Sequence, residues 1–403
     1  MAKPKLALIP ATQGSKLYSV LPADGVGDFT FSRGGTTGTS ATRINKDGLI
    51  ETVASGVSRL NYPLIDGVVN GCPSHLLEPS RLQLIPYSED FENSDWTKNA
   101  GTTITNNYAT SPDGTLNASR YLGTGASGLG DKFTLSSASY TLSFYVKSNT
   151  SENQFCALLG DSSQSSGDLL VTTEWKRISH TFTGSGLSNK TNGIFRDSSN
   201  NDIDILIYGA QLEQGSYPTS YIPNYGTSAG ITRVAETATG AGDASTFNDS
   251  EGVLMVEASA LANATNKYIN IYQDANNRIL LWITSTGVIR GYAIVNSSGS
   301  DVFIDAVGVD ATNNNKIALS WQGFTLSLFV NGVKIGDSTV TNSFSIMGLT
   351  TLDLKDVTNA NHFYGNTKQI QYFDSALNDS DLEKITSWTS FTDLANGQTY
   401  SIK

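Results

Sequence analysis

Hydrophobic and polar residues alternate along much of the chain, and a period of two is the pattern of a β-strand with one buried face. The clearest example begins at Asp202, after which isoleucines occupy every second position. Ile203, Ile205 and Ile207 point to one side, and Asp204, Leu206 and Tyr208 point to the other. Glycines and prolines that end a strand follow as far as Pro223. A β-domain is therefore predicted to close near residue 223.

Two earlier segments, Tyr140–Lys147 and Glu174–Thr183, show the same alternation. Their apolar positions are Leu142, Phe144, Val146, Ile178 and Phe182, and Tyr145, Trp175 and Arg177 lie on the opposite side. Together with the isoleucine strand, these segments predict an antiparallel β-sandwich over residues 86–223.

Residues 224–403 carry a second set of strand signals. Glu251–Ala258 predicts one strand, and Lys267–Thr284 predicts a hairpin. Lys316–Lys334 predicts another hairpin, because its Asn331-Gly332 pair is typical of a two-residue type I′ turn.

Residues 1–85 contain few long apolar runs and predict a turn-rich segment that packs on something larger. Asp28–Arg33 alternates, and Ala41–Val53 predicts a hairpin around the turn Lys46-Asp47-Gly48.

A short helix is predicted at Ser380–Trp388, with Ser380 as its cap and Glu383 three residues later. The composition agrees with a chain built mainly of strands and turns, because 38% of its residues are hydrophobic, 16% are charged and 38 are glycine. That balance excludes both a disordered chain and long helices. A length of 403 residues favours two or three domains, and we predict boundaries that give residues 1–85, 86–223 and 224–403.

The net charge of −11 argues against a nucleic-acid or anionic-membrane partner, because an acidic surface repels phosphate groups. No window approaches the roughly 20 apolar residues of a membrane span, so membrane insertion is not expected. The start, MAKPKLALIPATQG, has an apolar stretch too short for a signal peptide. Synthesis in a cytoplasm is therefore expected, with any external role reached by another route than secretion.

Three groups of residues carry family resemblances. FSR, ATR-N-GLIE, CPS-LLEP-R-L and YSEDF-N-W-K, which follow one another between Phe31 and Lys98, resemble the N-terminal region of bacteriophage tail-fibre-like and other virion proteins. YTLSFYVK, EWKRISHTFT and IYGAQLEQGSYPTSYIP resemble the jelly-roll, carbohydrate-binding-module-like domain of such proteins. LSLFVNGVK and QIQYFDSALNDSDLEKI resemble the end of concanavalin A-like or laminin-G-like domains.

These resemblances imply an all-β protein in which a turn-rich N-terminal segment precedes two antiparallel sandwiches, a jelly roll and a concanavalin- or laminin-G-like domain. They also imply a virion location, an N-terminal segment that joins other virion proteins of the capsid or tail, and a homo-oligomer, most plausibly a trimer. The expected function is adhesion to host-surface glycans as a fibre or spike component. The alternative is a purely structural head-fibre, spike or decoration component without a glycan site.

The sequence contains few of the residue patterns that catalysis requires. Glycosidases of the concanavalin-like fold carry E-x-D-x-x-E on one strand, which is missing here, and acids such as Glu251 and Glu257 lack its spacing. With only three histidines and no phosphate-binding loop, the chain also has little material for a triad or a nucleotide site. We therefore do not expect an enzyme, and a polysaccharide depolymerase would require two acids from distant strands to converge.

No cofactor is expected, although sandwich lectins often hold calcium and some loops are rich in Asp and Asn. The residues concerned are Asp274, Asn276, Asn277, Asp353, Asp356 and Asn359. They lack the spacing of a known calcium loop, and Asp and Asn often serve turns instead.

Outward-pointing aromatic and charged side chains are the candidates for glycan contact, because a flat ring covers a sugar face at little entropic cost. In the second domain they are Tyr145, Arg177, Asp204 and Tyr208, and in the third they are Tyr272, Trp282 and Trp321. The alternative is that these rings lie beneath a neighbouring domain or subunit.

Overall fold

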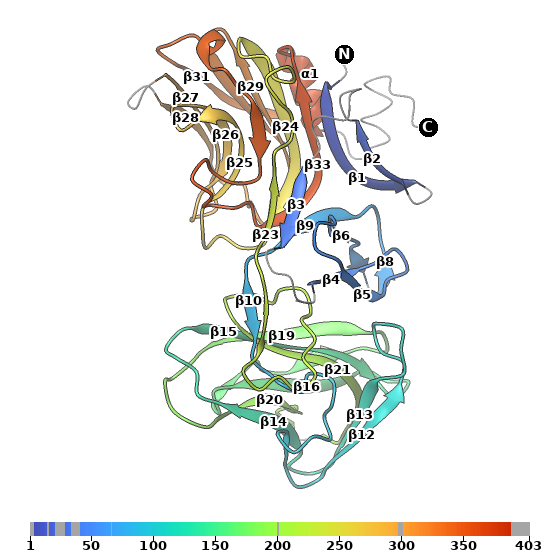
Figure 1. The fold of residues 1–403 in the computed structure, drawn as a ribbon. Helices are drawn as coiled ribbons and strands as arrows, with labels where there is room; N and C mark the ends of the chain where they lie inside the picture. Colours follow the sequence, from blue (N-terminus) through green and yellow to red (C-terminus); the bar gives the residue numbers. More distant parts are fainter. Residues whose placement is uncertain are drawn as a thin grey trace.

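The computed structural model describes residues 4–13, 16–20, 29–33, 41–65, 67–199, 201–296 and 301–387. Two β-sandwiches make up most of it, one above the other in Figure 1, with a few short strands between them. The chain is all-β, as predicted, apart from one 3-10 turn at Phe344–Ile346 and helix α1 at Asp379–Ser387 among the described residues. Asp28 and Trp388, at the ends of two predicted elements, lie outside these residues.

The lower sandwich in Figure 1 consists of two antiparallel sheets. One follows the order β11 (Thr97–Lys98), β14 (Gly128–Phe133), β20 (Lys190–Arg196), β16 (Gln154–Gly160) and β17 (Gln164–Ser165), with β18 (Leu169–Val171) also on β16. The other follows the order β12 (Thr102–Ala109), β13 (Ala118–Gly123), β21 (Ile203–Gln214), β15 (Ser139–Ser148) and β19 (Lys176–Thr183). The three strands predicted from alternation are β15, β19 and β21, and they are neighbours.

The core of the lower sandwich contains the apolar faces that the alternation predicted. Leu142, Phe144 and Val146 of β15 are fully buried, as are Ile205 and Ile207 of β21. They pack against side chains of the other sheet, among them Leu129, Cys156, Leu158 and Ile194. This burial of alternate side chains is what fixes the register of the strands.

The upper sandwich pairs a large sheet with a five-stranded one. The large sheet runs β2 (Lys16–Val20), β1 (Leu6–Gln13), β33 (Gly365–Phe373), β24 (Glu251–Ala260), β29 (Asn315–Gln322), β30 (Thr325–Val330) and β31 (Val333–Thr339), with β9 (Ser74–Leu77) on β33 and β6 (Leu60–Asn61) on β9. The five-stranded sheet runs β28 (Val302–Ala306), β27 (Ile289–Val295), β26 (Asn277–Ile283), β25 (Lys267–Asp274) and β32 (Thr351–Asp353). Strands from residues 1–85 thus lie in one sheet with strands from residues 251–373.

The remaining strands connect the two sandwiches. β3 (Thr30–Arg33) pairs with β23 (Glu236–Thr239), and β10 (Arg81–Gln83) pairs with β22 (Ile231–Arg233). β4 (Ala41–Ile44) and β5 (Ile50–Val53) form the predicted hairpin, and β7 (Leu64–Ile65) pairs with β8 (Val68–Val69). In Figure 1 these blue strands of the N-terminal segment lie between the sandwiches.

Helix α1 covers the outer face of the large sheet, where Leu382 and Ile385 pack against Val253 and Phe329. Its cap differs from the prediction. The side chain of Asn378, and not Ser380, accepts a hydrogen bond from the backbone N–H of Asp381 at 3.0 Å. The helix begins one residue before Ser380, which places that serine inside the first turn.

Five charged side chains meet between the sandwiches, and we call them the charged junction: Arg33, Arg59, Glu78, Arg233 and Glu236. All are at most 5% exposed. The Arg59 guanidinium donates to both glutamates, at 2.7 Å to Glu78. Arg33 binds Glu236 at 2.8 Å, and Arg233 lies 2.7 Å from Glu78. The junction therefore joins β22 and β23 to the N-terminal segment, which includes β3.

The lower sandwich is tied to the same junction through Ser220. Its N–H and hydroxyl donate to Glu78 at 2.8 and 2.6 Å. Burial alone would raise the pKa of Glu78, but Arg233 and Arg59 lower it to about 2, so the side chain remains a carboxylate. Because an unpaired charge cannot be left in such a buried place, each member depends on the others.

Replacement of Glu78 by Gln should therefore lower the free energy of unfolding by about 3 to 5 kcal/mol, because it leaves two buried arginines with one carboxylate too few. The matched control is Glu51→Gln, which breaks the partly exposed Arg43–Glu51 pair of the same segment and should cost about 1 kcal/mol or less. Denaturant unfolding of both variants measures the difference. Equal losses would show that the junction is not a special source of stability.

His75 lies beside the junction and is buried. Its Nδ1 atom is 2.6 Å from the Ser58 hydroxyl, and its Nε2 atom has no partner among the described residues. Burial, together with the nearby charges of Arg59 and Arg33, lowers the pKa of His75 to about 3. The folded protein therefore holds this ring in its neutral form.

Since the pKa is lower in the folded than in the unfolded chain, His75 stabilises the fold fully above about pH 6.5, and this contribution is lost as the pH falls toward 3. We expect a loss of about 2 kcal/mol between about pH 7.5 and pH 5 from this residue. His75→Gln should remove most of that slope in urea titrations at several pH values, whereas His180→Gln should retain it. An unchanged slope in His75→Gln would contradict this assignment.

Candidate functional site

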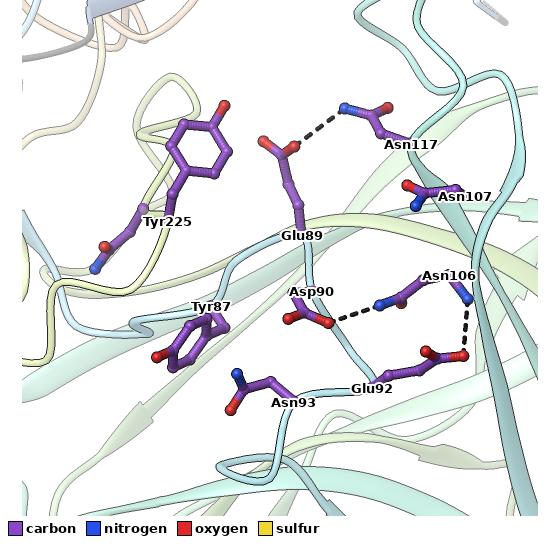
Figure 2. A pocket seen from close by; sticks show the side chains of 10 residues that line it. Tyr87, Glu89, Asp90, Glu92, Asn93, Asn106, Asn107, Asn117 and Tyr225 are labelled. Atoms are coloured by element: carbon purple, nitrogen blue, oxygen red, sulfur yellow. Dashed lines mark hydrogen bonds between the residues drawn. The ribbon is translucent and has the colours of Figure 1, made fainter.

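An open polar pocket of about 640 Å³ lies on the lower sandwich (Figure 2). Its walls carry three acidic side chains, five asparagines and two tyrosines. They are Tyr87, Glu89, Asp90, Glu92, Asn93, Asn106, Asn107, Asn117, Asn224 and Tyr225. We call it the polar pocket. Three chain segments build it, namely residues 87–93, the strand pair β12 and β13 with its connection, and the residues that leave the sandwich after β21.

The tyrosine side of the polar pocket is held by backbone pairing. Tyr87 and Tyr225 form an antiparallel bridge, and the Gly226 N–H donates to the Pro86 carbonyl at 2.7 Å. Asn224 is fully buried, and its side chain bonds both the N–H and the carbonyl of Thr227, at 2.9 and 3.0 Å. These contacts fix the loop, while the Tyr225 side chain remains 73% exposed.

The asparagine side results from an irregularity in β12. Between the pairs Thr105–Arg120 and Ala109–Ala118, three residues of β12 face one residue of β13, so the strand bulges. Asn107 adopts a left-handed backbone conformation with φ at +53°, which asparagine tolerates better than most residues. The bulge brings Asn106 and Asn107 to the pocket wall instead of continuing the alternation.

Hydrogen bonds connect the acidic segment to the asparagines, as the dashed lines of Figure 2 show. The Asn106 side chain donates to Asp90 at 2.6 Å, and its backbone N–H donates to Glu92 at 3.3 Å. The Asn117 amide donates to Glu89 at 3.0 Å, but its carbonyl oxygen is buried without a partner among the described residues. In each of these hydrogen-bonded pairs, the acidic residue and the asparagine both line the pocket.

Glu89 forms the floor of the polar pocket. Its carboxylate accepts a hydrogen bond from the Tyr221 hydroxyl at 2.8 Å, and the Tyr208 hydroxyl is 3.3 Å away. Burial and the neighbouring Asp113 raise the pKa of Glu89, although the tyrosine hydrogen bonds oppose that shift. Asp113 does not line the pocket, but its carboxylate accepts from the Asn117 amide of the pocket wall at 3.0 Å as well as from Thr115 in its own turn at 2.7 Å.

The side chains of this pocket suit a ligand rich in hydroxyl groups. Carboxylates accept, amides both donate and accept, and an exposed tyrosine ring offers a flat apolar surface. Among the described residues, no group of three or more His, Cys, Asp or Glu side chains could hold a metal ion. The side chains of the pocket offer hydrogen bonds and ring packing.

The site predicted on the second domain is assembled only in part. Arg177, Tyr145 and Tyr208 do lie side by side across β19, β15 and β21. The expectation that Tyr208 faces solvent is wrong, because it is 2% exposed. The hairpin residue Ile50 and Tyr221 pack over it, so the N-terminal segment covers this face.

The remaining space at this face is a smaller cavity of about 220 Å³, lined by Tyr145, Arg177 and residues of the N-terminal segment. Arg177 is already engaged, since it donates to the Thr219 carbonyl at 2.5 Å and to Ser143 at 3.0 Å. Asp204 lies near the start of β21, away from Tyr145 and Arg177, and Arg120 binds it there with two hydrogen bonds of 2.8 and 2.7 Å. The four predicted residues therefore do not form one open site.

In the upper sandwich, the expectation that Trp321 contacts ligand is wrong, because it is fully buried. A Cβ on Gly252 would lie 2.5 Å from the indole, so this glycine makes room for the ring in the core. Tyr372 stacks on it at a centroid distance of 6.0 Å. Alternation alone could not reveal this, because β29 is buried on both faces.

Tyr272 and Trp282 do lie on the outer face of the five-stranded sheet, and both are half-buried. Trp282 contacts Tyr268 and Tyr292 edge to face at centroid distances of 5.4 and 6.2 Å. The Arg290 guanidinium lies 4.7 Å above the Trp282 ring and 4.1 Å above the half-exposed Phe303 ring. We call this group of Tyr268, Trp282, Arg290, Tyr292 and Phe303 the aromatic face.

The residues considered for calcium are engaged in turns or in contacts between strands. Asp274 accepts from the N–H of Asn276 at 2.8 Å and from the side chain of Asn277 at 3.2 Å. Asp356 accepts from the N–H groups of Thr358 and Ala360 at 2.9 and 2.7 Å. The Asp353 carboxylate accepts from the Tyr272 hydroxyl at 2.7 Å, and Asn359 takes a left-handed conformation, with φ at +64°, in the Asp356 turn.

None of the residues of the polar pocket was predicted from the sequence as a ligand contact. Half of them belong to the motif YSEDF-N-W-K, which indicated a family and not a site. The clue was the density of acids and amides in that motif and in Thr105-Asn106-Asn107, where the alternation of a strand breaks down.

Comparison with known proteins finds no matching protein family and no matching curated protein. Solved structures with similar parts include the CBM40 module of the Ruminococcus gnavus IT-sialidase bound to α2,3 sialyllactose, with 18% identity, a TM-score of 0.31, and 35% of this chain and 84% of that chain covered. Another is domain 4 of the extracellular arabinanase AbnA from Geobacillus stearothermophilus in complex with arabinotriose. It is 14% identical, with a TM-score of 0.31, and the match covers 38% of this chain and 73% of that chain. A third is a heptameric SAP-like pentraxin from Limulus polyphemus, which is 13% identical with a TM-score of 0.29, and the match covers 35% of this chain and 71% of that chain.

Such low identities and TM-scores carry no argument about a ligand of this chain, whose site has to be judged from its own side chains. Within the part of the chain that the structure describes, no helix is long and apolar enough to cross a membrane.

Substitutions of Asn224 and Tyr225 test which of these two side chains holds the loop at the rim of the polar pocket. Asn224→Ala should lower the free energy of unfolding by about 1 to 3 kcal/mol, because it removes a buried side chain and its two hydrogen bonds to the backbone of Thr227. Tyr225→Ala should change it by about 0.5 kcal/mol or less, as for other exposed side chains. Denaturant unfolding of the two variants measures this, and a large loss in Tyr225→Ala would mean that the ring is a structural support.

Proposed function

We propose that this protein is a bacteriophage virion component, of fibre or spike type, that attaches to glycans on the host surface. The observation that carries the binding part of this proposal is the polar pocket, in which carboxylates, amides and an exposed tyrosine converge on about 640 Å³ of open space. The virion part is supported by the resemblance of the motifs between Phe31 and Lys98 and between Tyr140 and Pro223.

Sugar hydroxyls match this pocket because each can donate to a carboxylate and accept from an amide. The C–H face of a sugar ring packs well on a tyrosine, as Tyr225 offers at the rim. The volume lies within the range of about 300 to 1,000 Å³ that is common for small-ligand sites. Its openness suits a ligand that is one end of a longer surface chain.

A single open site of this kind binds weakly, so the proposal includes several copies per particle, most plausibly a trimer, for avidity. The N-terminal segment is proposed to join other virion proteins. It carries exposed apolar side chains on the hairpin of β7 and β8, where Ile65 is 57% and Val68 is 68% exposed. Such a patch is suited to a protein neighbour. The protein would then be made in the host cytoplasm and act on the released virion.

The second candidate function is purely structural, and one observation favours it. The aromatic row predicted as a glycan platform is covered by the protein's own N-terminal segment. This burial supports a role of Tyr145 and Tyr208 in packing between segments. Under this alternative the polar pocket and the aromatic face would be covered by neighbours in the particle.

We propose binding without cleavage. The acids of the pocket wall, Glu89, Asp90 and Glu92, come from one short segment, and two of them are held by Asn106. Incubation with host polysaccharide followed by an assay for new reducing ends tests this part of the proposal. Appearance of reducing ends that require Glu89 would establish a depolymerase instead.

The binding proposal predicts that the purified full chain binds a subset of a glycan array. Tyr225→Ala should weaken that binding by about 3- to 10-fold, because it removes the ring at the rim. Asn106→Ala should weaken glycan binding as well, because Asp90 loses the side-chain amide that donates to it and holds it in place. Titration calorimetry with the best array ligand gives the affinities.

The matched control is Tyr108→Ala. Tyr108 is a partly exposed tyrosine of β12, the strand that carries Asn106, and it does not line the pocket. Binding by this variant should equal that of the unchanged protein. If Trp282→Ala abolishes binding while the pocket variants retain it, the site lies on the aromatic face. If a folded protein binds no glycan and no host cell, the structural alternative is the better one.

A further inference from the structure

The walls of the polar pocket carry charge of only one sign. Glu89, Asp90 and Glu92 are acidic, and none of the residues that line the pocket is Lys, Arg or His. Lys98 lies close in the chain, but its ammonium group binds the backbone carbonyls of Glu92, Asn93 and Trp96 at 3.2 to 3.4 Å. It therefore supports the acidic segment without lining the pocket.

The two exposed carboxylates of the pocket wall have unused acceptor capacity. One oxygen of Asp90 accepts from the Asn106 side chain and one of Glu92 accepts from the Asn106 N–H. The second oxygen of each has no partner among the described residues. A ligand must therefore bring donors to these positions.

These two observations decide between classes of saccharide. An uncharged sugar offers a hydroxyl donor on almost every carbon. An acidic sugar, such as a sialic or uronic acid, adds a carboxylate that can only accept, and it would lie among wall carboxylates with no cation to pair with. Like charges a few ångströms apart repel strongly in a partly desolvated site.

We propose that the polar pocket selects uncharged saccharides and rejects those that carry a carboxylate. This inference rests on the proposed glycan-binding function and adds the class of ligand. Selection comes from repulsion by Asp90 and Glu92 as much as from attraction, which is how many sites exclude a close analogue. Tyr225 contributes affinity to both classes and therefore does not discriminate between them.

The test uses ligand pairs that differ only in the charged sugar. We expect the full chain to bind lactose-type or other uncharged oligosaccharides at least about 10-fold more tightly than the same oligosaccharides capped with sialic acid. Raising the salt concentration should narrow this ratio, because the discrimination is electrostatic. Arrays presenting both members of many pairs, followed by calorimetry, give the ratio for whichever sugar is bound.

The double variant Asp90→Asn, Glu92→Gln keeps the size of both side chains and removes both charges. It should reduce the ratio by at least about 3-fold, whereas Tyr225→Ala should lower the affinity for both ligands and leave the ratio unchanged. Thermal unfolding of each variant confirms that it is folded.

The outcomes separate the two proposals. Binding of capped oligosaccharides as tight as or tighter than that of uncapped ones would overturn the selectivity and leave glycan binding intact. An unchanged ratio in the double variant would show that the discrimination arises elsewhere and overturn the assignment to this pocket. Absence of binding to every member of the array by the folded protein would overturn both.

Discussion

The charged junction is the interaction on which the rest of the structure depends. Arg33, Arg59 and Arg233 are buried with two glutamates at a point where strands from the N-terminal segment and the start of the upper sandwich meet the end of the lower one. Charges at such depth are stable only when each has its partners in place. The junction therefore does more than add stability, because it allows only those arrangements of the two sandwiches in which all partners are present.

The polar pocket is connected to that junction by a short run of chain. Ser220 donates to Glu78 in the junction, and the next residue, Tyr221, donates to Glu89 on the pocket floor. Asn224 then anchors the loop that presents Tyr225 at the rim. Over six residues the chain thus passes from the contact between the sandwiches to the rim of the polar pocket.

The two outer sheet faces illustrate how similar sequence patterns lead to different surfaces. On the lower sandwich, Tyr145 and Tyr208 lie under Ile50 of the N-terminal hairpin and become part of a packing contact. On the upper sandwich, the aromatic face leaves Phe303 half-exposed. The polar pocket differs from both, because a bulge in β12 and not a regular strand forms its wall. The pocket offers mainly hydrogen-bonding groups, whereas the two faces offer mostly flat rings.

The sequence by itself determined the all-β class, the strands β15, β19, β21, β24, β25 and β26, and the turn at Asn331-Gly332, because period-two burial and turn conformation are local properties. It could not determine which outward ring stays exposed, since that depends on what packs above it: Tyr208 and Trp321 are buried, and Trp282 is only half-buried. The cap of α1 was missed because Asn378 and Ser380 both cap well and only the backbone path selects one. The polar pocket was decided by tertiary structure alone, because its walls come from segments more than a hundred residues apart that are brought together by sheet pairing, a bulge and buried charge.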